Sequence, residues 1–219
     1  YDISFKGWSS LARITTQKYS LLDPKLYMAH PWIPARWRAH CKKVVVEYWD
    51  KKLREEAATK SSLDFMDTSQ LSTSRPHKIY LYAGLNSDNV RKCTAQIWFL
   101  TGSYHTNERM FSMKMRNSPM CETCQIEENI YHMMLFCVCF SEIRDTFLSE
   151  ISVLNPMIKK YVHSKEVMIR TILDPECPSL PCDILQSWSN ITTDYQLCRD
   201  YCWDVHSKKE KSEKTLNHR

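Results

Sequence analysis

Apolar residues recur at three- and four-residue steps over much of the chain, the spacing that places side chains on one face of an α-helix. The longest pattern of this kind predicts a helix from about Ala35 to Lys60. Its apolar positions are Trp37, Cys41, Val44, Val45, Tyr48, Trp49, Leu53 and Ala57, and its other face is rich in Lys and Arg. A stripe like this is typical of a buried helix face, so we expect it to belong to a core.

Four shorter patterns predict further helices. The first runs from Trp8 to Asp23-Pro24, the second from a cap at Asp88 to a stop at Gly102, the third ends before Asn155-Pro156, and the last begins near Thr193. Strand-like alternation is confined to a few residues. The predicted fold class is therefore mainly α, a helical bundle-like region.

Segments rich in Pro, Ser and Thr divide the chain at His30–Pro34, 61–78 and 174–182. The expected organisation is a basic helical linker over 1–60, a loop or boundary over 61–88, a helix, metal motif and following helix over 89–155, a C-terminal helical segment over 156–206, and a disordered Lys/Glu tail over 207–219. The first residue is Tyr1, and no secretory pattern follows it, so we expect a piece of a longer chain or a degraded copy of one.

Charge is distributed unevenly within the net +5 of the 219 residues. Residues 1–60 hold twelve Lys/Arg against six Asp/Glu, residues 91–120 hold five against one, and residues 121–150 hold one against six. Basic segments suit a phosphate backbone or an acidic protein, although they can also be solvated helix faces. The three glycines argue against a Gly-rich phosphate loop, and no apolar run reaches the ~20 residues of a spanning helix.

Three of the ten cysteines and one of the eight histidines fall within seventeen residues, as Cys121, Cys124, His132 and Cys137 in the spacing C-x2-C-x7-H-x4-C. Three thiolates and one imidazole at this spacing suit a closed, structural Zn²⁺ site. Without a secretory signal we expect reduced thiols in the cytoplasm and nucleus rather than disulfides. Cys139 competes for the fourth position. A second metal site is the weaker alternative, formed by Cys177, Cys182, Cys198, Cys202 and His206.

The segment before the metal motif combines cations with aromatic residues, as nucleic-acid-binding segments do. The candidate phosphate contacts are Lys92, Arg109, Lys114 and Arg116, with Tyr104 and Phe111 between them. The acidic residues Glu122, Glu127 and Glu128 follow, within the candidate metal motif of residues 121–137, which we call the metal loop. We therefore expect the basic flank to bind nucleic acid better than the metal loop does.

Several segments resemble the region after the polymerase domain of non-LTR (LINE-type) retrotransposon reverse transcriptases. The resemblance is carried by Ile97–Tyr104, by the C-x2-C…H-x4-C segment, and by Ile143-Arg144. Upstream, Trp32–Arg38 and Tyr48–Leu53 look like the helical linker of that family, and Ile172–Pro175 and Tyr201–His206 look like its closing segment. The resemblance covers nearly the whole chain, and the metal segment is its most specific part.

The resemblance implies a zinc-binding, nucleic-acid-binding C-terminal part of a reverse transcriptase, with RNA or DNA and an upstream polymerase domain as partners and no membrane. Polymerases of this family hold their metal ions with an aromatic-x-Asp-Asp turn, and this sequence contains no Asp-Asp pair. By itself the chain is therefore expected to be no enzyme. The alternative function is a structural or protein-interaction helical module with an architectural zinc.

Overall fold

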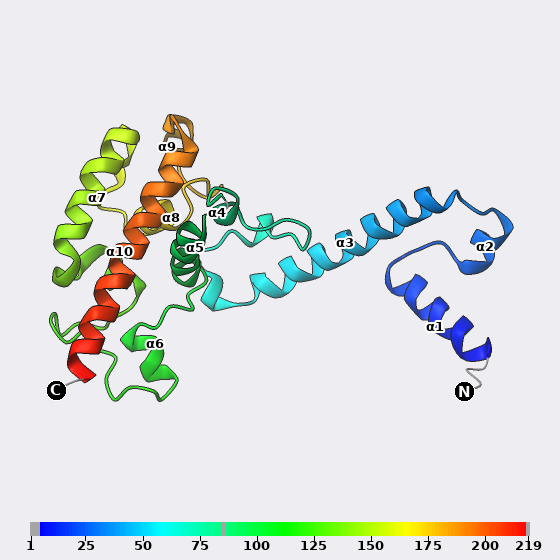
Figure 1. Ribbon diagram of the computed structural model, residues 1–219, viewed down its shortest axis with the longest axis horizontal. Helices are drawn as coiled ribbons and strands as arrows, with labels where there is room; N and C mark the ends of the chain where they lie inside the picture. The colour runs from blue at the N-terminus through cyan, green and yellow to red at the C-terminus, as the bar shows by residue number, and fades with distance from the viewer. Residues whose placement is uncertain (1–4, 85, 218–219) are drawn as a thin grey trace. The chain divides into compact units, whose positions relative to one another are not determined.

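The computed structural model describes residues 5–84 and 86–217, which divide into two compact units (Figure 1). The first unit takes in the residues up to Thr59 together with Ser69–Arg75, and the second takes in Lys60–Thr68 and the chain from Pro76 onward. The described residues are mainly helical, as predicted, and contain no strand beyond one isolated bridge between Met120 and Glu127.

The first unit contains α1 (Phe5–Lys18), α2 (Pro24–Ala29) and α3 (Pro34–Ala58). The Asp23-Pro24 pair begins α2 rather than ending the first helix. The Asp23 carboxylate accepts a hydrogen bond from the Lys25 N–H at 2.8 Å, and proline is tolerated in the first helical turn because no N–H partner is needed there. The predicted helix from Ala35 to Lys60 is observed as α3, which begins one residue earlier and ends two residues earlier than predicted.

The prediction that the α3 stripe forms a core is wrong. Ala57 is the one buried residue described within α3, whereas Trp49 and Leu53 keep 38% and 36% of their surface exposed. The stripe instead makes ring contacts, Tyr48 with Tyr19 and Trp37 with Tyr27. The reason is that α1 and α2 are short and cover only part of a 25-residue helix.

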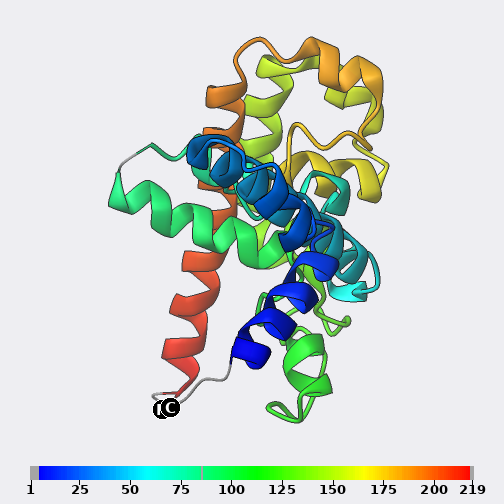
Figure 2. The ribbon, with the colours of Figure 1, turned by 90° about the vertical axis from the view of Figure 1, so that its right-hand side faces the viewer.

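The second unit is built around α10 (Ile191–Asn217), which packs against α5 (Ser87–Leu100), α7 (Ser141–Leu154) and α8 (Lys165–Leu173) (Figure 1; Figure 2). Its remaining elements are η1 (Ser61–Leu63), α4 (Lys78–Leu81), α6 (Asn107–Ser112), η3 (His132–Phe136), η4 (Val138–Phe140), η5 (Pro156–Tyr161) and α9 (Cys182–Ser187), and the division between the two units falls within η2 (Thr68–Gln70). The predicted loop over 61–88 therefore holds η1, η2, α4 and the first two residues of α5.

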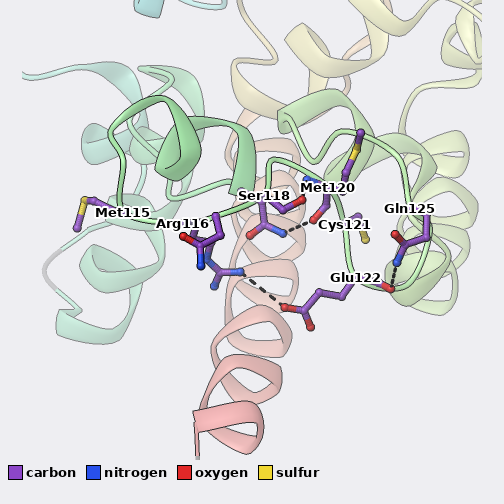
Figure 3. A pocket seen from close by; sticks show the side chains of 9 residues that line it. Met115, Arg116, Ser118, Met120, Cys121, Glu122 and Gln125 are labelled. Carbon is purple, nitrogen blue, oxygen red and sulfur yellow. Dashed lines mark hydrogen bonds and ion pairs between the residues drawn. The ribbon is translucent and has the colours of Figure 1, made fainter.

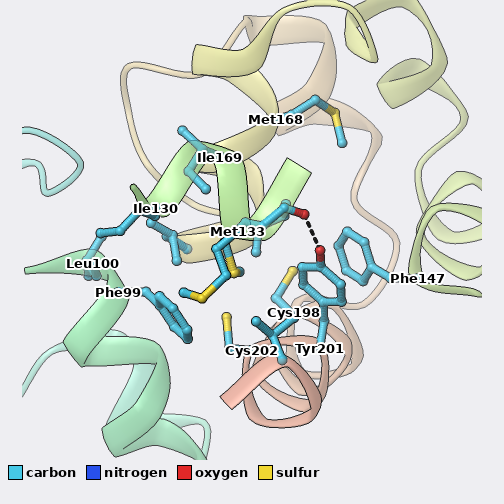
Figure 4. Packing of buried hydrophobic residues seen from close by; sticks show 14 of the residues in the cluster. Phe99, Leu100, Ile130, Met133, Phe147, Met168, Ile169, Cys198, Tyr201 and Cys202 are labelled. Carbon is cyan, nitrogen blue, oxygen red and sulfur yellow. Dashed lines mark hydrogen bonds between the residues drawn. The ribbon is translucent and has the colours of Figure 1, made fainter. Parts of the chain in front are cut away.

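Buried aromatic and sulfur-containing side chains fill the space between these helices (Figure 4). Phe147 stacks on Tyr201 with ring centroids 4.4 Å apart, and the Tyr201 hydroxyl donates a hydrogen bond to the Met134 carbonyl. Met133 is fully buried beside them. The metal-motif segment is thus part of the main core of this unit rather than an appendage.

The stop predicted at Gly102 is confirmed, whereas the cap of the same helix is Asn86 and not Asp88. The Asn86 side chain accepts from the Asp88 N–H at 2.8 Å. Gly102 adopts φ +60°, and a Cβ there would collide with the Ser62 carbonyl oxygen. Glycine is therefore required both by the left-handed backbone and by the close approach of η1.

The predicted disorder of 207–219 is corrected over 207–217, where α10 continues as a helix; the last two residues lie outside the described ones. Pairs of opposite charge four residues apart join Lys209 to Glu213 and Lys214 to Glu210. Such pairs stabilise a helix. Lys209 also forms an ion pair with Glu128, outside α10.

Candidate metal centre

A tight loop presents the first two cysteines. The Cys121 N–H donates to the Ile126 carbonyl at 2.7 Å, and the Gln125 N–H donates to the Cys121 carbonyl at 2.9 Å. Gln125 closes the turn with φ +55°, in the left-handed region. These bonds fold Cys121 and Cys124 to the same side of the loop, where both thiols can reach one ion.

His132 and Cys137 are brought together by the single wide turn of η3. Its closing bond runs from the Cys137 N–H to the His132 carbonyl at 2.6 Å, five residues back, which is the hydrogen-bond pattern of a π-turn. The Asn129 side chain accepts from the His132 N–H at 2.9 Å, and Arg144 donates to the Cys137 carbonyl at 3.1 Å. The π-turn therefore brings together two residues that have four others between them, as in the H-x4-C spacing.

The four predicted ligand residues converge, with ligand atoms all within 4.8 Å of one another. The Cys137 sulfur lies 3.8 Å from that of Cys121 and 3.7 Å from that of Cys124. Thiolates at about 2.3 Å from a tetrahedral ion would lie about 3.8 Å apart. The His132 Nε2 is buried and has no hydrogen-bond partner among the described residues. The arrangement fits a tetrahedral metal ion with no open position.

The surroundings of the site disfavour free thiolates. Burial raises the pKa of the Cys137 thiol well above its ordinary value, while the neighbouring sulfurs raise it further. Burial lowers the pKa of His132, which favours the neutral imidazole that metals bind, although Glu128 nearby opposes this. A bound cation would compensate the negative charge that three buried thiolates would otherwise carry.

Cys139 lies outside this group. Its sulfur donates a hydrogen bond to the Thr123 hydroxyl at 3.0 Å, and the Cys137 sulfur is the one that faces the other cysteines. Between these two rivals for the fourth position, the geometry favours Cys137.

The alternative second site is not assembled, since Cys121, Cys124, His132 and Cys137 form the one metal-compatible group found among the described residues. Cys198 is fully buried and donates to the Thr171 carbonyl, whereas Cys182 is exposed. The His206 Nδ1 is hydrogen-bonded to the Tyr104 hydroxyl at 3.2 Å. Cys198 and Cys202 serve the packing of α10 instead, since both are fully buried.

The four predicted phosphate contacts do not form one patch. Lys92 pairs with Asp200 at 2.8 Å and Arg116 pairs with Glu213 at 2.6 Å. Because those two acids are thirteen positions apart on α10, the pairs lie about 20 Å apart along the helix. Arg109 donates to the Gly102 carbonyl. Within the described part of the chain, no ion pair or side-chain hydrogen bond is found for Lys114, which is exposed at φ +59°.

One important contact was missed at the sequence level. The Lys209 ammonium lies 2.5 Å from the Glu128 carboxylate, with side chains only 12% and 6% exposed, and Glu128 also accepts from the Asn107 N–H at 3.1 Å. This pair joins the C-terminal half of α10 to the metal loop. The four-residue spacing of Val205, Lys209 and Glu213 was the signal that the helix continues.

Comparisons with known proteins returned no relationship: no family model, no curated protein and no solved structure matches this chain. The helices in the described ranges were also tested as membrane spans, and each is too short or too polar to cross a bilayer.

Proposed function

We propose that the chain is a non-catalytic, nucleic-acid-binding module stabilised by a structural zinc ion. In this proposal it belongs to the C-terminal part of a retrotransposon reverse transcriptase and supports RNA-templated DNA synthesis. The observation that carries the zinc assignment is the convergence of three sulfurs and one unpartnered imidazole nitrogen at tetrahedral spacing. Bound there, Zn²⁺ would tie the Cys121 loop to the turn at His132, and both to the core of the second unit.

The metal assignment is tested by zinc analysis of protein purified under reducing conditions. We expect one Zn²⁺ per chain, lost in Cys121→Ser, Cys124→Ser, His132→Ala and Cys137→Ser. Cys139→Ser is the matched control, because it removes a sulfur two residues beyond a ligand. Unchanged zinc in Cys121→Ser would refute the site, and loss only in Cys139→Ser would move the fourth ligand.

Support for nucleic-acid binding comes from the first half of α3. Residues 34–46 contain Arg36, Arg38, Lys42 and Lys43 but no acidic residue. Lys43 pairs with Glu47, and the exposed guanidinium of Arg36 lies 4.7 Å from the Trp32 ring centroid. Arg36, Arg38 and Lys42 have no acidic partner among the described residues, so phosphates can approach them without displacing a carboxylate.

A salt titration against single-stranded RNA and duplex DNA tests this surface. Changing Arg36, Arg38 and Lys42 together to Gln removes about three phosphate contacts. The slope of log affinity against log salt should fall by about 2 for single strands and by nearly 3 for duplex DNA. The matched control changes Lys43, Lys51 and Lys52 to Gln, because each already pairs with a Glu four residues on. Equal slopes in both triple variants would refute the assignment.

The parentage has a separate test in the reading frame that encodes the chain. A polymerase segment with an aromatic-x-Asp-Asp turn upstream of the Tyr1 codon would support a reverse transcriptase, and a continuous frame without one would count against it.

The second candidate is a helical module for structure or protein interaction. It is favoured by the intramolecular partners of Lys92, Arg109 and Arg116, which leave these cations less available to phosphate. This candidate predicts weak nucleic-acid binding with a shallow salt dependence in the unmodified chain.

A further inference from the structure

A pocket of about 430 Å³ lies beside the candidate metal centre, between the loop that follows α6 and the Cys121 turn (Figure 3). Its lining presents a guanidinium, amides, a hydroxyl and a carboxylate, from Arg116, Asn107, Asn117, Gln125, Ser118 and Glu122. A wall with both donors and acceptors suits a neutral polar ligand better than a phosphate, which Glu122 would repel.

Arg116 is held in place by two carboxylates. One of its nitrogens lies 2.6 Å from Glu213 and another lies 3.9 Å from Glu122, and Figure 3 shows the pair with Glu122 at the edge of the pocket. Its charge is therefore already balanced, so a phosphate would have to displace a carboxylate to bind it. The faces of a fixed guanidinium plane remain able to stack on a nucleobase.

Asn107 supplies an acceptor at the pocket. The side chain of this 2%-exposed residue donates from Nδ2 to the Met120 carbonyl at 2.8 Å, and that bond fixes which end of the amide is oxygen. Its Oδ1 is buried and lacks a hydrogen-bond partner among the described residues. Because a buried acceptor without a donor is costly, this position favours a ligand that brings an N–H group.

We propose that this pocket receives one unpaired aminopurine base, adenine or guanine, of a bound single strand. The base stacks on the Arg116 guanidinium. Its exocyclic amino group donates to Asn107 Oδ1, which is covered in the free chain and becomes accessible when the base displaces the side chains over it. The fused rings of a purine cover more of the guanidinium plane than a pyrimidine does. This inference rests on the proposed function, and it adds a contact that depends on the base rather than on phosphate.

The test uses the full zinc-loaded chain and labelled 12-nucleotide RNA strands with the same number of phosphates. One strand carries adenine throughout, one carries unsubstituted purine, which lacks the amino group, and one is abasic. We expect the adenine strand to bind about ten-fold more tightly than the abasic strand, with the purine strand in between. Two further strands repeat the comparison. Each is the purine strand with one base replaced, by guanine in one and by hypoxanthine, which lacks the amino group of guanine, in the other.

Arg116→Lys keeps the positive charge beside Glu213 but removes the planar guanidinium on which a base could stack. We expect it to bring the adenine and abasic affinities to within about two-fold, with the salt slope unchanged. Arg91→Lys is the matched control, since Arg91 also sits 3.9 Å from a carboxylate, that of Asp88, and lies outside the pocket. It should retain the full difference between the strands.

Equal affinity for the adenine and abasic strands would overturn this inference while leaving the proposed function standing, since phosphate binding would remain. A preference for adenine that survives in Arg116→Lys would also overturn it. Equal binding of the amino-bearing and amino-free strands, in both comparisons, would remove the contact to Asn107. Absence of salt-dependent binding to any strand would overturn the proposed function and this inference together.

Discussion

The ion pair of Lys209 and Glu128 is the contact whose removal should most affect the link between α10 and the metal loop. Lys209→Met keeps most of the apolar stem but leaves the Glu128 carboxylate buried, with the Asn107 N–H as its remaining partner. Breaking a buried pair on one side costs about 3–5 kcal/mol. Because the hydrogen bond from the Asn107 N–H to Glu128 persists, we expect a loss at the lower end of this range, about 3 kcal/mol.

Urea unfolding followed by circular dichroism measures this loss. With a slope of about 2 kcal/mol per molar urea, a loss of about 3 kcal/mol lowers the midpoint by about 1.5 M. Lys214→Met is the matched control, the same substitution on the same helix. Its pair with Glu210 spans 3.5 Å with side chains 74% and 51% exposed, so its loss should cost at most about 0.5 kcal/mol.

The result that would refute the reasoning is a small and equal shift in both variants, because Glu128 would then be solvated and residues 207–217 would not pack as a helix. A second check is the double variant with Glu128→Gln. Removing the stranded charge should recover part of the stability that Lys209→Met loses, whereas simple additivity would show that the two side chains do not interact.

Three further outcomes are expected. Chelation of zinc should lower hydrogen-exchange protection over residues 120–140, because the ion would join the Cys121 loop to the turn at His132, and should leave the protection of α3 in the other unit unchanged; equal protection of residues 120–140 with and without chelator would contradict this. Burial raises the pKa of the Asp194 carboxyl to about 6, so ionising it costs stability as the pH rises from about 4 to about 6. Asp194→Asn should therefore gain about 2–3 kcal/mol in urea unfolding at pH 7 and less at pH 5, and a gain that does not change with pH would contradict the burial of this charge. Gly102→Ala should lower the free energy of unfolding by more than the roughly 1 kcal/mol that a left-handed alanine costs, because its Cβ meets the Ser62 backbone. An unchanged urea midpoint would show that η1 does not approach the end of α5 so closely.

Local pattern was sufficient for the five longest α-helices of the described residues, and for the candidate ligand set. The five helices are α1, α3, α5, α7 and α10, whereas α2, α4, α6, α8 and α9 were not predicted individually. The three- and four-residue periodicity that predicts α3 and α7 is a property of neighbouring positions, as is the glycine at 102 that must follow α5. The four candidate ligands could be named because C-x2-C and H-x4-C each correspond to one turn of backbone, and the structure brings these four side chains together. Between Cys137 and Cys139, however, spacing alone left both open.

Tertiary structure decided what the charged and apolar side chains do. The α3 stripe has core periodicity, yet periodicity cannot show whether enough protein lies opposite to cover it. Lys209 and Glu128 are 81 residues apart in sequence, and the partners of Lys92 and Arg116 lie on a segment expected to be separate or disordered. Lysines and arginines look alike in a sequence whether they face solvent or a buried carboxylate. Their roles depend on long-range packing, which sets the burial of each charge and the partner within its reach.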